Sequence, residues 1–170
     1  MAVLLAATLR LVQAGHLIVP AWVTWESTEL EVDFDGNGSP KRVTLDSGSL
    51  AVSAADGTSL YQTPDDWRVA RVSVGDVDQN GADELLMLTW RRGNYGTSRP
   101  FWETGIDLRM TEHLYVLEMR DGAMVPKWMS HELGAPVASV TVQDDGTVVL
   151  TTTDGVDTTW CWEGFGFILT

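Results

Sequence analysis

The sequence predicts an all-β domain made of about three four-stranded, propeller-like blades, that is, a partial or small β-propeller. Three observations support this prediction. Short runs alternate polar and apolar side chains, as in Lys41–Leu45, Ser49–Ser53 and Trp67–Val74. Asp-Gly pairs, which are typical of hairpin turns, separate such runs. An Asp-rich loop occurs twice, and each copy leads into a strand-like run.

The composition is that of a folded, acidic domain. The chain has 170 residues, of which 44% are hydrophobic, so it is long enough to bury the core of one domain. The formal net charge is −13 with only 11 Lys and Arg residues, so we expect no nucleic-acid partner, because phosphate binding draws on clustered basic side chains. No segment has the roughly 20 uninterrupted apolar residues of a transmembrane span.

The chain divides into an N-terminal segment, residues 1–28, and a β-rich domain, residues 29–170. Residues 1–19 are mostly apolar but are interrupted by Arg10, Gln13 and His16, and they lack the basic start of a signal peptide. Two interpretations remain open for this segment. It is either a short helix or a degenerate export signal, followed in both cases by an entry strand.

The acidic loop is an internal repeat. The segment Asp-Phe-Asp-Gly-Asn-Gly-Ser-Pro-Lys, residues 33–41, matches Asp-Val-Asp-Gln-Asn-Gly-Ala-Asp-Glu, residues 76–84, at an offset of 43. A period near 40 with four strands per unit is typical of propeller blades. Counting strands gives blades at about 28–64, 66–133 and 135–170, with an insertion at 91–112 in the second blade.

Three blades are fewer than the four to eight of a closed propeller. Either the N-terminal segment completes a small compact β-domain, or the chain belongs to a larger or oligomeric assembly. Open blade edges present unpaired backbone groups, so self-association through these edges is a further expectation.

The second copy of the loop has the pattern of a Ca²⁺ site. Oxygen-bearing side chains recur at Asp76, Asp78, Asn80 and Glu84, and Gly81 directly follows the third of them. Calcium takes six to eight oxygen ligands at about 2.3–2.6 Å. A tight loop around an ion needs a sharp bend, which glycine permits. The alternative is a solvated hairpin rich in turn-forming residues.

The first copy of the loop is a weaker metal candidate. It offers Asp33, Asp35 and Asn37, but Lys41 occupies the position of Glu84. An ammonium about 4 Å from a divalent ion is strongly unfavourable in a partly desolvated site. We therefore also consider that Lys41 reaches across to the two aspartates and takes the place of the ion.

The insertion concentrates basic and aromatic side chains. Over residues 90–112 the candidate ligand-binding residues are Arg91, Arg92, Tyr95, Arg99 and Trp102. Arginine forks beside aromatic rings suit the recognition of sugars or carboxylates. The alternative is that the aromatic rings cover the core while the arginines pair with the surplus acidic residues.

The loop at 76–84 and the Val-Ser-Val-Gly-Asp segment before it, residues 72–76, resemble the FG-GAP/VCBS repeat of integrin-like β-propellers and bacterial surface proteins. The resemblance covers about 20 residues around Asp76 and is weaker around Asp33. It implies a calcium-stabilised blade, with ligands at Asp76, Asp78, Asn80, the backbone carbonyl of Ala82, and Glu84. It implies no single activity, because such blades serve as adhesion, sugar-binding and accessory scaffolds.

The function expected from these features is that of a calcium-stabilised, non-enzymatic binding or accessory module with a glycan or protein partner. The alternative is a carbohydrate-binding or carbohydrate-processing protein that uses the insertion at 90–112. No motif of nucleophile and base is present, so no catalytic residue is assigned. Weak calcium loops suit millimolar extracellular calcium, so we expect an extracellular or cell-surface location.

Overall fold

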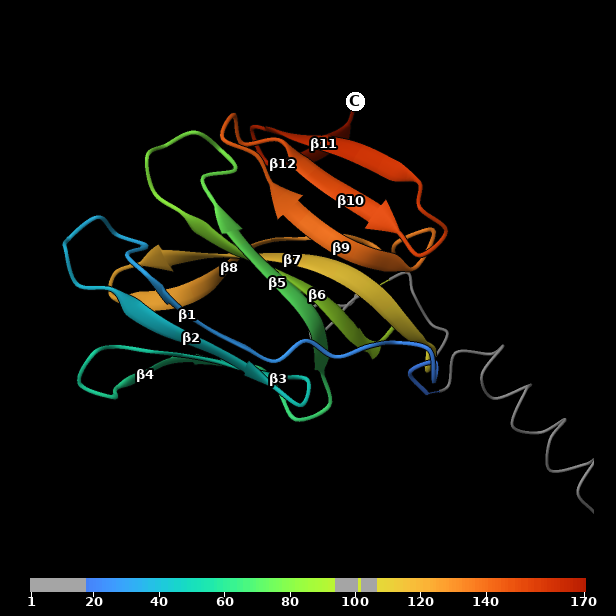
Figure 1. Ribbon diagram of the computed structural model, residues 1–170, viewed down its shortest axis with the longest axis horizontal. Helices are drawn as coiled ribbons and strands as arrows, with labels where there is room; N and C mark the ends of the chain where they lie inside the picture. Colours follow the sequence, from blue (N-terminus) through green and yellow to red (C-terminus); the bar gives the residue numbers. More distant parts are fainter. Residues whose placement is uncertain (1–17, 94–100, 102–106) are drawn as a thin grey trace, which may run out of the picture.

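The computed structural model describes residues 18–93, 101 and 107–170 of the chain. Within these residues it contains twelve β-strands and no helix, which confirms the predicted all-β class. The strands form three four-stranded antiparallel sheets, with the second sheet lying between the other two (Figure 1). The described part of the chain accordingly contains no helix that is long and apolar enough to cross a membrane.

Each sheet is built from strands that are consecutive in the chain. The first sheet has the order β1 (Thr28–Val32), β2 (Lys41–Asp46), β3 (Ser49–Ser53) and β4 (Ser59–Gln62). The second has the order β5 (Arg68–Gly75), β6 (Glu84–Arg92), β7 (Met110–Arg120) and β8 (Ala123–Met129). The third contains β9 (Val137–Val142), β10 (Val148–Thr152), β11 (Asp157–Glu163) and β12 (Gly166–Leu169).

The predicted count of three four-stranded units is therefore confirmed, and the Asp-Gly pairs lie where hairpins were expected. Gly57, Gly122 and Gly146 stand in the turns β3–β4, β7–β8 and β9–β10, each with a positive φ. The first and third sheets both pack against the second, through β4 on β8 and β9 on β5. In the described residues the sheets do not close into a ring, so a propeller stays a prediction.

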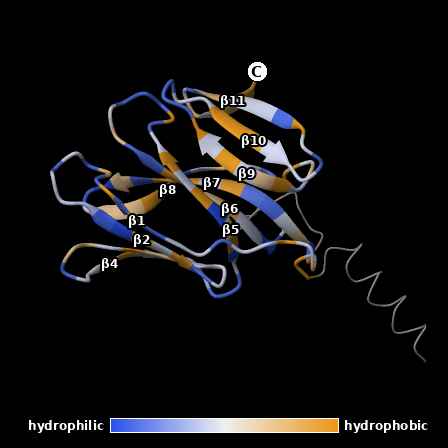
Figure 2. Cartoon of the chain, in the orientation of Figure 1, coloured by the Kyte–Doolittle hydropathy of each residue, from blue (hydrophilic) through white to orange (hydrophobic). Residues whose placement is uncertain are grey.

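The second sheet is buried on both faces, which explains its long apolar strands. Successive side chains of a strand point to opposite faces. Leu85 and Met87 of β6 therefore join the core shared with the first sheet, whereas Leu86 and Leu88 join the core shared with the third. The hydrophobic residues run along these central strands (Figure 2).

The insertion in the second sheet is shorter than the predicted 91–112. Strand β6 continues to Arg92 and pairs there with Met110 at the start of β7, so the connection spans residues 93–109. The difference arises because β6 and β7 continue to pair at Arg91–Thr111 and Arg92–Met110, where the sequence no longer shows a clear alternation of polar and apolar residues. The expectations for residues 1–17 lie outside the described residues.

The third sheet approaches the second at two glycines that leave no room for a side chain. A Cβ at Gly75 would lie 2.6 Å from Val142 Cγ1. A Cβ at Gly146, whose φ is +79°, would lie 2.9 Å from the backbone oxygen of Asp76. The β9–β10 turn thus rests directly on the backbone of the acidic loop at 76–84.

We expect Gly146→Ala to destabilise the protein more than Gly155→Ala, its matched control in the next turn. Both glycines have a positive φ, 79° and 83°, but a Cβ at Gly155 meets nothing within 4 Å. The control therefore loses about 1 kcal/mol for its backbone conformation, and Gly146→Ala loses a further 1–3 kcal/mol or so for the steric conflict. Urea denaturation of both variants measures the difference, and equal losses would contradict the close packing.

Candidate metal centre

The loop between β5 and β6 is held in shape by its own side chains. Asp76 accepts the backbone N–H groups of Asn80 at 2.9 Å and Gly81 at 2.7 Å. The side-chain oxygen of Asn80 accepts the N–H of Ala82 at 2.8 Å. The chain turns at Gln79 and Gly81, with φ values of 59° and 89°. These bonds draw the oxygen-bearing side chains into one compact turn.

The first copy of the loop, between β1 and β2, makes the same three hydrogen bonds. Asp33 accepts the N–H groups of Asn37 at 3.2 Å and Gly38 at 2.8 Å, and Asn37 accepts the N–H of Ser39 at 2.7 Å. Gly36 has a φ of 61° and stands at the position equivalent to Gln79. The two loops are therefore equivalent in backbone structure as well as in sequence.

The second loop brings three predicted ligands together. Asp76, Asp78 and Glu84 each offer a carboxylate oxygen, and these three oxygens lie within 4.8 Å of one another. Two oxygens bound to the same Ca²⁺ at about 2.4 Å are at most about 4.8 Å apart, so the cluster fits a single ion. Asp78 Oδ1 is also buried without a hydrogen-bond partner. A nearby cation would relieve the cost of burying this oxygen.

Glu84 is the most buried member of the cluster, with only 1% of its surface exposed. Its Oε2 accepts the backbone N–H of Val77 at 3.0 Å, which ties the end of the loop to its beginning. Burial raises the pKa of Glu84, and the contacts with Lys127 and Val77 offset this only in part. Glu84 therefore needs a cation beside it to remain charged at low cost.

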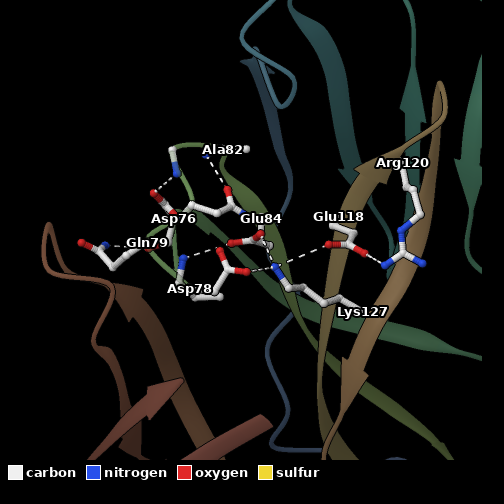
Figure 3. Close-up of polar contacts among 11 residues, drawn as sticks. Asp76, Asp78, Gln79, Ala82, Glu84, Glu118, Arg120 and Lys127 are labelled. Carbon is white, nitrogen blue, oxygen red and sulfur yellow. Dashed lines mark hydrogen bonds and ion pairs between the residues drawn. The ribbon is translucent and has the colours of Figure 1, made fainter. Parts of the chain in front are cut away.

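That cation in the structure is Lys127 of β8, a residue that the sequence did not single out. Lys127 Nζ donates to Asp78 Oδ2 at 2.5 Å and to Glu84 Oε1 at 2.7 Å (Figure 3). Desolvation disfavours the charge on Lys127, but Asp78 and Glu84 together raise its pKa above the usual value. Nothing in the sequence could have linked it to the loop, because it lies more than 40 residues downstream in another strand.

The first loop also contains an ammonium. Lys41 Nζ lies 3.3 Å from Asp35 Oδ1 and donates to the backbone oxygen of Ser39 at 2.5 Å. Asn37 Nδ2 donates to the same aspartate at 2.7 Å. The expectation that Lys41 pairs with the acidic residues of its loop is thus confirmed for Asp35.

The residues predicted to line a ligand surface on the insertion are placed only in part. Arg91 belongs to β6 and is 1% exposed, with its guanidinium carbon 5.8 Å from the ring centres of Trp67 and Tyr115. Its side chain therefore packs inside the molecule. Arg92 donates to the backbone oxygen of Leu108 at 2.8 Å. The remaining three candidates lie outside the described residues, so this surface stays a prediction: Tyr95, Arg99 and Trp102.

Charged residues also line a cleft of about 250 Å³ at the end of β6 and the start of β7, opposite the end of these strands that carries the acidic loop. Arg109 on its rim pairs with Asp107 at 3.1 Å and with Glu132 at 3.0 Å. Glu112 on its wall is 5% exposed and accepts the backbone N–H of Val137 at 2.8 Å. Burial raises the pKa of Glu112 to about 7. This carboxyl group therefore anchors the third sheet to the second.

His113, the next residue along β7, is fully buried. Its Nε2 shares a hydrogen bond with the Thr111 hydroxyl at 2.8 Å, and its Nδ1 lies 3.2 Å from the backbone oxygen of Ser130. Burial lowers the pKa of His113 to about 4, so the ring is neutral at pH 7. These bonds give it a structural role in the second sheet.

We expect the buried Glu112 to make the wild type lose stability as the pH rises. Its pKa increases from 4.5 to about 7 on folding, so folding favours the protonated form. Between these values the unfolded chain releases the proton and the folded chain keeps it, and the free energy of unfolding falls by about 3 kcal/mol in total. Glu112→Gln keeps an acceptor for Val137 and removes this titration.

Urea denaturation of both proteins at pH 5 and pH 8 measures the effect as a difference between them. His113 has the opposite dependence, since its lowered pKa contributes stability that is lost as the pH falls from 6.5 towards 4. That contribution is common to both proteins and cancels in the comparison. Parallel stability profiles for the wild type and Glu112→Gln would show that Glu112 is ionised in the folded state.

Comparison with known proteins gave no match: no protein-family model, no curated protein and no solved structure is significantly similar to this chain.

Proposed function

We propose that the loop at 76–84 binds one Ca²⁺ ion and that the bound ion stabilises a non-enzymatic β-module. The ligands would be Asp76, Asp78, Asn80, the backbone carbonyl of Ala82, and Glu84. One observation carries the proposal: three carboxylates converge within 4.8 Å, and Asp78 Oδ1 among them is buried without a partner. A hard cation satisfies that oxygen and balances the charge of the cluster.

The chemistry of the ligand set favours calcium over magnesium. Calcium accepts irregular sets of carboxylate, amide and backbone oxygens, whereas magnesium requires near-ideal octahedral geometry and keeps several water molecules. The loop combines three carboxylates with an asparagine and closes through backbone hydrogen bonds to Asp76. Such a loop is a low-symmetry cage of the kind that calcium tolerates.

We further propose that the module acts as a binding or accessory domain outside the cell or at its surface, with a glycan or protein partner. The resemblance of residues 72–86 to the FG-GAP/VCBS repeat supports this role, as does a formal net charge of −13. Extracellular calcium is millimolar, which suits a loop whose affinity is reduced by a competing lysine.

We expect calcium to raise the melting temperature and a chelator to lower it again. At a calcium concentration 100 times the dissociation constant the stabilisation is about 2.7 kcal/mol. For a chain of this length that corresponds to a rise of roughly 5–10 °C. Magnesium at the same concentration should have a smaller effect. Differential scanning calorimetry with calcium, magnesium or chelator measures these shifts.

The variant that disables the site is Asp78→Asn, which keeps the shape of the side chain but removes one ligand charge. This variant should lose most of the calcium-dependent shift. The matched control is Asp154→Asn in the exposed β10–β11 turn, at the end of β10 that lies away from the loop; it removes the same charge and should keep the shift. A melting temperature that is indifferent to calcium and chelator in the wild type would reject the proposed site.

We expect Lys41→Glu to create a second calcium site in the first loop. The two loops share their hydrogen bonds, so the substitution replaces the ammonium beside Asp35 with the carboxylate found at Glu84. Isothermal titration calorimetry should show two bound ions in place of one. Lys41→Gln removes the ammonium without adding a carboxylate, and here we expect one ion. An unchanged stoichiometry in Lys41→Glu would contradict the equivalence of the loops.

A further inference from the structure

Lys127 stands inside the proposed calcium cluster and not at its edge. Its ammonium contacts Asp78 at 2.5 Å and Glu84 at 2.7 Å, which are two of the three clustered carboxylates. The side chain is only 10% exposed, so the ammonium is shielded from water. A calcium ion bound to the same two carboxylates would lie within a few ångströms of the ammonium and repel it strongly.

The backbone of β8 is shaped so that Lys127 reaches the loop. In the pairing of β7 with β8, Val116 is opposite Trp128 and Leu117 is opposite Pro126, so Lys127 has no partner of its own. It is the extra residue of a β-bulge. Bulges redirect a side chain relative to the regular alternation of the strand, and they are frequent beside functional sites.

A third carboxylate lies on the far side of the ammonium. Glu118 Oε2 of β7 is 3.5 Å from Lys127 Nζ, and Glu118 also bonds to Arg120 (Figure 3). Glu118 is not among the clustered carboxylates that fit the ion. A short movement of the ammonium from Asp78 and Glu84 towards Glu118 would free the cluster and keep the lysine paired.

We propose that Lys127 is the resident cation of this loop and that calcium binds by exchange, with the ammonium passing from Asp78 and Glu84 to Glu118. This inference rests on the proposed function. In the absence of calcium, Lys127 neutralises the buried Glu84 and holds the fold together. In the presence of calcium, its displacement lowers the apparent affinity, so Lys127 sets the calcium concentration at which the loop is occupied.

The first variant that tests this proposal is Lys127→Met, which keeps the length of the side chain and removes its charge. By calorimetric titration we expect it to bind calcium at least tenfold more tightly than the wild type. In chelator we expect it to melt at a lower temperature, because Glu84 loses its cation. A lysine with only a packing role would lower the melting temperature without improving the affinity.

The second variant, Glu118→Gln, removes the proposed acceptor and does not depend on the folding of Lys127→Met. We expect several-fold weaker calcium binding, because the displaced ammonium has no alternative partner. In a Lys127→Met background the same substitution should have little effect. If Glu118 acts only through its long-range charge, Glu118→Gln will weaken calcium binding equally in the wild-type and Lys127→Met backgrounds. That result would show that the exchange with Glu118 is wrong.

The results separate this inference from the proposed function. If the wild type binds calcium and Lys127→Met binds equally or more weakly, the exchange is overturned and the calcium site stands. If only Lys127→Met binds calcium, Lys127 occupies the loop permanently, and both the native calcium site and the exchange are rejected. If neither protein binds calcium, the proposed function and the exchange both fail.

Discussion

The buried carboxylate of Glu84 is the constraint on which this region of the molecule depends. It is 1% exposed, and a charged group in such a position is tolerated only if it is paired and hydrogen-bonded. The N–H of Val77 and the ammonium of Lys127 meet both needs at 3.0 Å and 2.7 Å. Through these two contacts Glu84 joins the loop, the start of β6 and the strand β8, so the identity of the cation affects all three.

The two loops show that the backbone turn and the cation are separate properties. Asp33 and Asp76 accept equivalent pairs of backbone N–H groups, so each turn is stabilised by hydrogen bonds to its own first aspartate. Each loop nevertheless has an ammonium beside its second aspartate, Lys41 on Asp35 and Lys127 on Asp78. The lysines come from different places, one at the end of its own loop and the other from β8. A positive charge at this point is therefore the common requirement.

Local features of the sequence predicted the all-β class and the three four-stranded units, because turn chemistry and alternation act over a few residues. The Asp-Gly turns and the repeat of Asp33 and Asp76 were found from spacing alone. Long-range placement was not predictable in this way. The β-bulge that turns Lys127 into the loop depends on the pairing of β7 with β8. The burial of Arg91 depends on the rings of Trp67, just before β5, and Tyr115 in β7. No local pattern in the sequence records either contact.

The cation at the loop is also in a position to influence the third sheet. Gly146 in the β9–β10 turn packs on the backbone of Asp76, with no space for a Cβ between them. On the other side, Lys127 lies 5.3 Å from the ring centre of Trp162 in β11. Packed interfaces change between discrete arrangements and do not deform continuously. An exchange of lysine for calcium between these two contacts would therefore act on the docking of the third sheet, and stability that is gained at the loop would extend to that interface.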